Sequence, residues 1–374
     1  MNVSKFVEVI GSEFYAGVPD SQLKPLCNYL MEKYDVNPKH HVIAANEGNC
    51  VGIAAGYYLA TKKIPVVYMQ NSGEGNVINP LASLLNEKVY GIPIVFVIGW
   101  RGQPGVHDEP QHVYQGEITT KLMELMGVPY VILDSEMTDH SFENEFKLLK
   151  TNLLKGKSIA IIVKKGALQY VEKCSYANEY GVKREEIIKH IVRVTKDDPI
   201  ISTTGKASRE LFEIREKEKQ GHEKDFLTVG SMGHSSSIAM GIALQKESTK
   251  LWCIDGDGAL LMHMGAMAVI GANKIENMVH IVINNGAHET VGGMPTVAKE
   301  VDLVQIAKGC GYPFVTSVST IDELDNVLEL AKKRTELCFI EVKSAIGSRD
   351  DLGRPTTTTK ENKDGFMEYL ETLN

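Results

Sequence analysis

Short apolar runs rich in β-branched residues recur along the chain, each bounded by glycine, proline or charged residues. The runs are IPVVYMQ (64–70), IPIVFVIGW (92–100), SIAIIVKK (158–165), LWCID (251–255), MVHIVIN (278–284) and LCFIEVK (337–343). Strands that are apolar on both faces and alternate with helical stretches are typical of a parallel sheet covered by helices on both sides. The pattern predicts an α/β protein with doubly wound parallel sheets.

The two halves of the chain share one pattern. GIAAGYYLATKKIPVVYMQNSG (52–73) and SIAMGIALQKESTKLWCIDGDG (237–258) each contain an Ile-Ala-x-Gly helix, a turn with lysine and an apolar strand that ends in a glycine loop. Gly56 and Gly73 are 17 positions apart (73 − 56), as are Gly241 and Gly258 (258 − 241). Internal repeats of this kind predict two domains of similar topology. We place the boundary in a polar segment near Glu179, which gives domains 1–179 and 180–374.

Composition narrows the class of protein. The chain has 374 residues, 43% hydrophobic and 24% charged, with a net charge of −8, which argues against a nucleic-acid binder. No run approaches the roughly 20 apolar residues of a membrane span, and the N-terminus lacks the apolar core of a signal peptide. The cysteines are widely spaced, so we expect buried thiols, no zinc site and a cytoplasmic protein. They are Cys27, Cys50, Cys174, Cys253, Cys310 and Cys338.

Two polar loops follow neighbouring apolar runs. Gly256-Asp257-Gly258 ends one run, and Asn284-Asn285 ends the next, and Asp257 and Asn285 are 28 positions apart (285 − 257). This is the length of one strand–helix–strand unit, whose right-handed crossover brings both loops to the same edge of a parallel sheet. A carboxylate, an amide and a backbone carbonyl form an oxygen set that suits Mg²⁺. The alternative is two ordinary loops, because a lone Gly-Asp-Gly is usually a turn.

Gly-Asp-Gly followed about 30 residues later by Asn-Asn resembles the thiamine diphosphate signature. The resemblance implies that Asp257, the side chain of Asn285 and the carbonyl of Ala287 hold Mg²⁺, which neutralises the diphosphate of the cofactor. Asp255 has no such partner, and we expect it only to shape the turn.

The first half carries a second part of the resemblance. Glu47 precedes a Gly/Ala-rich helix in AANEGNCVGIAAG, and a later apolar strand leads into Ser72-Gly73-Glu74-Gly75-Asn76-Val77-Ile78-Asn79. This order resembles the pyrimidine-binding domain of thiamine diphosphate-dependent decarboxylases and acetohydroxyacid synthases. It implies that Glu47 is the carboxyl group at N1′ of the aminopyrimidine, which drives it to its imino tautomer. It also places Asn71 and Gly73 at the cofactor. Alternatively, Glu47 is an ordinary acid stabilised by a helix N-terminus.

The same resemblance implies a diphosphate-binding domain in the second half, with Met232 as the wedge beneath the cofactor. The implied cofactor-binding residues there are Thr204, Gly205, Gly230, Ser231, Met232, His234, Asp257, Gly258, Ala259 and Asn285. Amides at the start of the helix near His234 are candidates for diphosphate contacts. Ser235 and Ser236 are equally candidates for plain helix N-caps.

Three further sequence segments narrow the resemblance to one family. FYAGVPDSQLKPL (14–26), GWRGQPGVHDEPQH (99–112) and GRPTTTTKENK (353–363) resemble the phosphonopyruvate decarboxylase family, with the sulfopyruvate decarboxylases close in pattern. This implies decarboxylation of 3-phosphonopyruvate to phosphonoacetaldehyde and CO₂, in phosphonate biosynthesis, by a homo-oligomer with active sites at subunit interfaces. The alternatives are sulfopyruvate decarboxylation or a non-catalytic thiamine diphosphate-binding subunit, which would be expected to lack Glu47.

The resemblance implies a small phosphonate 2-oxo acid as the substrate, so cations or N–H donors should lie near the reacting carbon. The candidate cations are Arg101, His107, His112, Lys206, Arg209, Arg349 and Arg354. His112 with Gln111 is the preferred pair for proton transfer, since histidine titrates near neutral pH. Asp20 lies where related decarboxylases place an active-site acid. We expect Glu74 to point away from the anionic substrate, and the role of Glu289 stays open.

Overall fold

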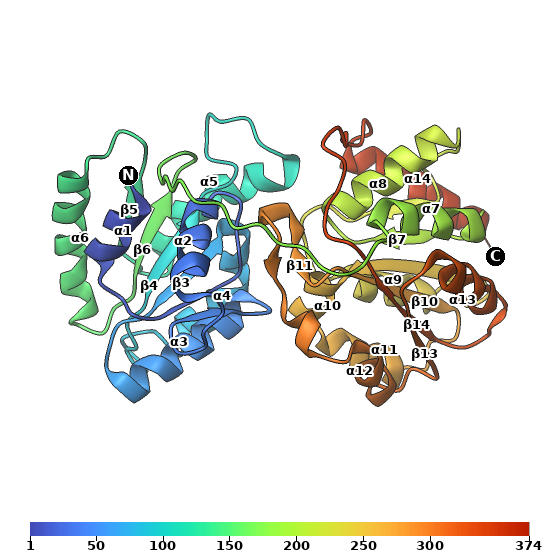
Figure 1. Cartoon of the computed structure of the whole chain (residues 1–374), viewed down its shortest axis with the longest axis horizontal. Coiled ribbons are helices and arrows are strands. Elements are labelled where there is room, and N and C mark those ends of the chain that lie inside the picture. Colours follow the sequence, from blue (N-terminus) through green and yellow to red (C-terminus); the bar gives the residue numbers. More distant parts are fainter. Residues whose placement is uncertain (374) are drawn as a thin grey trace. The chain divides into compact units, whose positions relative to one another are not determined.

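The computed structural model describes residues 1–373. Its contacts divide the chain into two compact units, Met1–Ser175 and a second that starts at Tyr176; each is drawn in Figure 1. The second unit therefore starts three residues before Glu179 (179 − 176). None of the helices in residues 1–373 is long and apolar enough to span a membrane.

The first unit is built on a six-stranded sheet in the order β2-β1-β3-β4-β6-β5, with every pair parallel. Its strands are β1 (Tyr15–Gly17), β2 (His41–Ile43), β3 (Val66–Gln70), β4 (Val95–Gly99), β5 (Tyr130–Leu133) and β6 (Ile159–Val163). Its helices are α1 (Val3–Ile10), α2 (Lys24–Tyr34), α3 (Glu47–Thr61), η1 (Asn71–Gly73), α4 (Glu74–Ala82), α5 (Pro110–Leu125) and α6 (Asp139–Leu153).

The second unit repeats this topology. Its main sheet, read from one edge, has the order β8-β7-β9-β10-β14-β13, which corresponds strand for strand to β2-β1-β3-β4-β6-β5. The prediction of two parallel-sheet units of similar topology is therefore confirmed. The strands are β7 (Ile200–Ser202), β8 (Asp225–Leu227), β9 (Leu251–Gly256), β10 (Met278–Asn284), β13 (Phe314–Val318) and β14 (Cys338–Lys343). A short hairpin adds β11 (Ala287–His288) and β12 (Met294–Pro295).

Helices cover both faces of the second sheet. They are α7 (Arg184–Thr195), α8 (Lys206–Lys217), α9 (Ser235–Ala243), α10 (Asp257–Met262), α11 (Gly265–Ala272), η2 (Glu289–Val291), η3 (Val297–Glu300), α12 (Leu303–Gly309), α13 (Ile321–Lys333) and α14 (Thr359–Thr372). Along β9, Trp252 and Ile254 pack in the cluster that contains α7, α8 and α13, whereas Leu251 and Cys253 pack in the opposite one. Because both faces are buried, the strand is apolar at successive positions.

The order of strands reverses at the same place in both sheets. In the first unit β1 and β3 lie side by side, and in the second β7 and β9 do. Loops at the carboxyl ends of such strands are where doubly wound sheets bind ligands. Residues 18–20 and 71–73 follow these strands in the first unit, and residues 203–205 and 257–258 follow them in the second.

A buried ion pair fastens α8 to β8 within the second unit. Arg215 donates from Nε and Nη2 to the two carboxylate oxygens of Asp225, each at 2.8 Å. The side chains are 0% and 1% exposed. Removing one partner of such a pair leaves the other charge buried without compensation, which is more costly than losing an exposed pair.

We predict that Asp225→Ala lowers the free energy of unfolding by about 3–5 kcal/mol. Asp197→Ala is the matched control, because Asp197 also binds a cation, Lys224, but is 81% exposed in that pair. Asp197→Ala should lower the free energy of unfolding by no more than about 1 kcal/mol. Urea unfolding followed by circular dichroism measures both, and equal losses in the two variants would contradict the interpretation.

Candidate active site

Asp257 and Asn285 leave adjacent strands at one edge of the second sheet. Strands β9 and β10 pair in parallel, with Gly256 opposite Ile283. Asp257 comes directly after β9 and starts α10, and Asn285 comes directly after β10. The spacing of the two polar loops therefore predicted their common edge correctly.

The carboxylate of Asp257 is buried without a cation from the chain. Its side chain is 3% exposed, and Oδ2 accepts a hydrogen bond from Thr296 Oγ1. Burial raises its pKa to about 6, opposed by hydrogen bonds from Thr296 and from the backbone of Gly258 and Asn285. No ion pair to this carboxylate forms among residues 1–373. A desolvated carboxylate of this kind is costly unless it is protonated or paired with a cation.

The side-chain amide of Asn285 is held in a defined orientation. Its Oδ1 accepts from the N–H of Ala287 at 3.0 Å, and its Nδ2 donates to Glu289 Oε2 at 3.0 Å. In the described part of the chain, no three His, Cys, Asp or Glu side chains cluster as a metal site. Asp257, Asn285 and the carbonyl of Ala287 instead offer a carboxylate, an amide and a carbonyl. Such an oxygen set fits Mg²⁺, which completes its shell with phosphate oxygens and water.

Three side chains lie around Gly258: His288 and Thr296 from the hairpin of β11 and β12, and Met232 from the loop after β8. A methyl group on Gly258 would lie 3.4 Å from Met232 Cε, 3.5 Å from Thr296 Cγ2 and 3.7 Å from His288 Cε1. Met232, named from the sequence, is thus close to the acidic loop. His288 and Thr296 were missed, because neither belongs to a recognisable motif. Desolvation lowers the pKa of His288 to about 4, so its ring is neutral at pH 7.

The loops after β7 and β8 have unusual backbone geometry. Gly205, with φ 90°, is the N-cap of α8, and Thr204 Oγ1 accepts from the N–H of Gly230 at 3.1 Å. Gly230, Ser231 and Gly233 all have positive φ, of 68°, 33° and 87°. A serine in this region stores backbone strain, which is a feature of ligand-binding loops.

Several buried hydroxyl groups near these strand ends lack a partner. Thr203 Oγ1, Thr228 Oγ1 and Ser235 Oγ have no hydrogen-bond partner among the described residues. His234, not Ser235 or Ser236, is the N-cap of α9, so the plain-cap alternative for the two serines is wrong. Buried polar groups are nearly always hydrogen-bonded, and orphans of this kind suit a polar ligand. Ala259 is buried in the first turn of α10.

Glu47 is the first residue of α3, in the first unit. The N-cap before it is Asn46, whose side chain accepts from the N–H of Asn49. Glu47 is 5% exposed, and its Oε2 accepts from Asn76 Nδ2 at 2.6 Å. A Cβ on Gly73 would lie 2.5 Å from the Glu47 carboxyl carbon, so only glycine leaves room for the acid. Burial raises the pKa of Glu47, opposed by the hydrogen bond from Asn76.

Asp20 and Arg101 lie near each other at the edge of the first sheet. Asp20 is 1% exposed; burial raises its pKa to about 6, and Arg101 opposes that shift. Asp20 Oδ2 accepts from the N–H of Gln22 and Leu23, while Oδ1 has no partner among the described residues. Arg101 is not free, because its Nε donates to Asp108 Oδ2 at 2.8 Å.

Gln111 and His112 lie in the first turn of α5. Desolvation, followed by the charge of Arg101, lowers the pKa of His112. Its Nδ1 is buried and has no hydrogen-bond partner in the described residues. Gly102 has φ 66°, and a Cβ there would lie 1.8 Å from the His112 carbonyl oxygen. This glycine therefore allows the loop after β4 to pack against the start of α5.

Asn71 and Glu74 follow β3, and both side chains are buried. Asn71 Nδ2 donates to the carbonyl of Arg101 at 2.8 Å and to Thr119 Oγ1 at 3.0 Å, so its amide is committed to the protein. The carboxyl group of Glu74 faces the interior near Thr119. Burial raises its pKa to about 8, opposed by Thr119. Glu74 is therefore an inward-facing acid. That it points away from the substrate stays a prediction.

Most of the cations named from the sequence already bind protein groups. Lys206 Nζ lies 3.0 Å from Glu289 Oε1 and 2.7 Å from Ser348 Oγ. Arg209 Nε donates to the carbonyl of Gly353 at 2.6 Å, and Arg349 Nε donates to Glu185 at 2.7 Å. His107 is exposed. These contacts could not be read from the sequence, where a paired and an unpaired cation look alike.

Asp255 contacts the turn that it was expected to shape. Its Oδ1 accepts from the N–H of Gly256 at 3.0 Å, and its Oδ2 lies 3.5 Å from His280 Nε2. Both side chains are 0% exposed. His280 lies in the apolar run of β10, on the strand next to β9. Neither Asp255 Oδ2 nor His280 Nε2 has a hydrogen-bond partner among the described residues.

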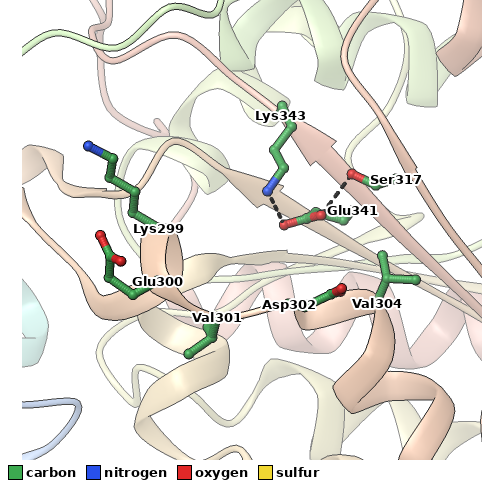
Figure 2. Close-up of a pocket in the computed structure, with 8 residues that line it drawn as sticks. All are labelled: Lys299, Glu300, Val301, Asp302, Val304, Ser317, Glu341 and Lys343. Carbon is green, nitrogen blue, oxygen red and sulfur yellow. Dashed lines mark hydrogen bonds and ion pairs between the residues drawn. The ribbon is translucent and has the colours of Figure 1, made fainter.

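A second acid supports the Asn-Asn loop from the side of β14. Glu341 lines an open pocket of about 510 Å³ and points between Ser317 and Lys343 (Figure 2). It accepts from Ser317 Oγ at 2.7 Å and from Asn284 Nδ2 at 2.7 Å. Asn284 Oδ1 in turn accepts from the N–H of Gly286 at 3.0 Å. The residues that line this pocket are not among the candidate cofactor residues, but its buried acid holds the residue beside Asn285.

Two protein-family models match the chain in the regions just described. Residues 3–124 match the N-terminal TPP (thiamine pyrophosphate) binding domain of thiamine pyrophosphate enzymes. Residues 203–342 match the C-terminal TPP binding domain of the same enzymes. The first range contains Glu47 and the second contains Asp257 and Asn285, so each match falls on one part of the candidate site.

Curated relatives extend the similarity to nearly the whole chain. Phosphonopyruvate decarboxylase of Streptomyces viridochromogenes is 30% identical, covering 97% of this chain and 92% of the relative. Sulfopyruvate decarboxylase of Methanosarcina acetivorans is 27% identical, covering 98% and 97%. Sulfopyruvate decarboxylase subunit beta of Methanocaldococcus jannaschii is 39% identical, covering 50% and 97%. The chain therefore belongs to the thiamine diphosphate-dependent 2-oxo acid decarboxylases, in the family that includes the phosphonopyruvate and sulfopyruvate decarboxylases.

Proposed function

We propose that this enzyme converts 3-phosphonopyruvate to phosphonoacetaldehyde and CO₂, with thiamine diphosphate and Mg²⁺, in phosphonate biosynthesis. The observation that carries the proposal is the 30% identity to a phosphonopyruvate decarboxylase over 97% of the chain. A cytoplasmic location fits the cysteines, all six of which are free thiols. The second candidate is sulfopyruvate decarboxylation, which is favoured by the 39% identity to the sulfopyruvate decarboxylase beta subunit over half of the chain.

The second unit would hold the metal and the diphosphate. Asp257, Asn285 and the carbonyl of Ala287 are the proposed Mg²⁺ ligands. The buried, cation-free carboxylate of Asp257 is the strongest support for this assignment. The orphan hydroxyls of Thr203 and Ser235 are proposed to bind diphosphate oxygens, because an anion would give these buried donors a partner.

The first unit would supply the proton chemistry. When bound, thiamine diphosphate provides the electron sink for the pair released as the carboxylate leaves as CO₂. Glu47 is proposed to hold a proton at N1′ of the aminopyrimidine, which fits its raised pKa and its contact with Asn76. His112, with Gln111, is proposed to move a proton at the substrate, and its unpartnered Nδ1 supports that role. Asp20 is the second acid proposed there.

We also propose a homo-oligomer with active sites at subunit interfaces. Glu47 belongs to the first unit and Asp257 to the second, and the chemistry needs both. The helix that begins at Glu47 leaves space for a neighbour, since added methyl groups on Gly52 and Gly56 would meet nothing within 4 Å. Leu59 on the same helix is 68% exposed.

Purified enzyme with Mg²⁺ and thiamine diphosphate should release CO₂ from 3-phosphonopyruvate with a higher kcat/KM than from sulfopyruvate or pyruvate. The physical reason is that phosphonate and sulfonate differ in charge and geometry, so the anion site should discriminate between them. A coupled CO₂ assay on the three acids at equal concentration measures the ratio. A preference for sulfopyruvate would replace the proposed substrate.

Asp257→Asn should stabilise the cofactor-free protein at pH 7 and remove its response to Mg²⁺ with thiamine diphosphate. The folded pKa of about 6 lies above the ordinary value, so stability from this group is present at low pH and is lost as pH rises through about 6. The gap between variant and wild type should therefore shrink below pH 6 in thermal unfolding scans.

The control for this variant is Asp302→Asn, because Asp302 is an exposed acid that serves as the N-cap of α12 and asparagine caps equally well. Wild type and the control should both gain about 2.7 kcal/mol of stability at a ligand concentration a hundredfold above Kd. An Asp257→Asn protein that still gains it would contradict the metal assignment.

Glu47→Ala should lose activity by at least about a hundredfold while still binding thiamine diphosphate. Co-expression with Asp257→Ala should restore about a quarter of wild-type activity. Half of randomly assembled dimers are mixed, and one of the two shared sites in each is intact. A steady-state CO₂ assay on the mixture measures the rescue. No rescue, with mixed dimers verified by differential tags, would contradict sites shared between subunits.

A further inference from the structure

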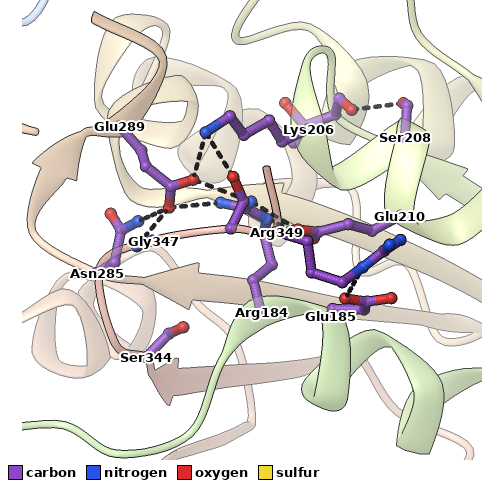
Figure 3. A network of polar contacts seen from close by, with 12 residues as sticks. Arg184, Glu185, Lys206, Ser208, Glu210, Asn285, Glu289, Ser344, Gly347 and Arg349 are labelled. Atoms are coloured by element: carbon purple, nitrogen blue, oxygen red, sulfur yellow. Dashed lines mark hydrogen bonds and ion pairs between the residues drawn. The ribbon is translucent and has the colours of Figure 1, made fainter. Parts of the chain in front are cut away.

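One carboxylate joins four segments of the second unit around Asn285. Glu289 lies in η2 and its side chain is 7% exposed. Figure 3 shows it among the polar side chains that surround it. Its oxygens accept from Asn285 Nδ2 at 3.0 Å, Arg184 Nη1 at 3.0 Å, Arg184 Nη2 at 3.2 Å, Lys206 Nζ at 3.0 Å and Gly347 N at 3.2 Å.

The carboxylate of Glu289 is paired with two cations. Arg184 Nη1 lies 3.0 Å from its Oε2, and Lys206 Nζ lies 3.0 Å from its Oε1. An ionised carboxylate only accepts hydrogen bonds. It can therefore bind the NH₂ edge of the Asn285 amide but not the oxygen edge.

This restriction sets the orientation of the amide. A metal ion binds an amide through its oxygen, so an asparagine ligand must present Oδ1 and turn Nδ2 away. With Nδ2 on Glu289, Oδ1 occupies the opposite edge, where it accepts from the N–H of Ala287 at 3.0 Å. We propose that Glu289 is a positioning residue that fixes the Asn285 amide with its oxygen toward Mg²⁺. The proposal rests on the metal site proposed above.

Glu289 is itself fixed by a rigid neighbour. Arg184 donates from Nε and Nη2 to Glu210 at 2.7 and 2.8 Å, and both of these side chains are nearly buried. The guanidinium is thus held between two carboxylates, Glu210 on α8 and Glu289 beside the metal loop. Of these two acids, Glu289 binds the Asn285 amide, whereas the hydrogen bonds of Glu210 go to Arg184. Glu210 therefore provides a matched control for the loss of an Arg184 partner.

The test measures Mg²⁺ affinity by isothermal titration of the full chain at saturating thiamine diphosphate. Glu289→Ala should weaken Mg²⁺ binding about 10–100-fold, the usual effect of removing a group that orients a metal ligand. Glu210→Ala should stay within about twofold of wild type. Both variants lose one partner of Arg184, so a general loss of packing would affect both alike.

The conservative variant keeps the test informative if Glu289→Ala does not fold. In Glu289→Gln the amide oxygen should take the Oε2 position, because donors from Asn285, Arg184 and Gly347 converge there. It retains an acceptor for Asn285, so Mg²⁺ affinity should remain within about fivefold of wild type. A loss in this variant as large as in Glu289→Ala would show that charge, and not orientation, matters and would overturn the proposal.

A double-mutant cycle completes the test. If Glu289 acts through Asn285, then Glu289→Ala should change Mg²⁺ affinity little in an Asn285→Ala background. Additive effects, or unchanged affinity in Glu289→Ala alone, would overturn the positioning role while leaving the metal site in place. If wild type itself binds no Mg²⁺ with thiamine diphosphate, the proposed metal site fails, and the positioning role fails with it.

Discussion

Parallel pairing between β9 and β10 decides where the polar side chains of the second unit can meet. Since the two strands run in the same direction, the residues that follow them leave at one edge, and Asp257 lies next to the loop of Asn285. The hairpin that carries Thr296 packs over this edge and hydrogen-bonds to the acid. The proposed site depends on this pairing. Without it, Asp257 and Asn285 would not lie close enough together to share a metal ion with the loops after β7 and β8.

Burial of charge is the second feature that the site depends on. Asp257 is removed from water without a cation from the chain, whereas Glu289 and Glu210 are paired with Arg184. Glu289 and Glu210 are held in fixed positions by Arg184. Asp257 has no such partner among residues 1–373, which is why we propose it as a metal ligand. Glu47 in the first unit is likewise buried beside Gly73, and burial raises its pKa with no ion pair to it among residues 1–373.

The positions of residues that directly follow a strand were predictable, because the length of a strand–helix–strand unit brings the ends of successive strands to the same edge of the sheet. Asp257, Asn285 and the repeated Gly56–Gly73 and Gly241–Gly258 units belong to this class. Contacts between residues far apart in the chain were not predictable. Arg184 and Glu289 are 105 positions apart, and nothing in their local sequence marks them as partners.

The central claim is that Asp257, Asn285 and Ala287 hold the metal that carries the cofactor. A crystal structure of the enzyme with thiamine diphosphate and Mn²⁺ in place of Mg²⁺ tests it, because manganese gives an anomalous signal that locates the ion. The account predicts one strong peak in direct contact with the Asp257 carboxylate, Asn285 Oδ1 and the Ala287 carbonyl, with Asn285 Nδ2 still on Glu289. A peak elsewhere, or an Asn285 amide turned with its nitrogen toward the ion, would contradict it.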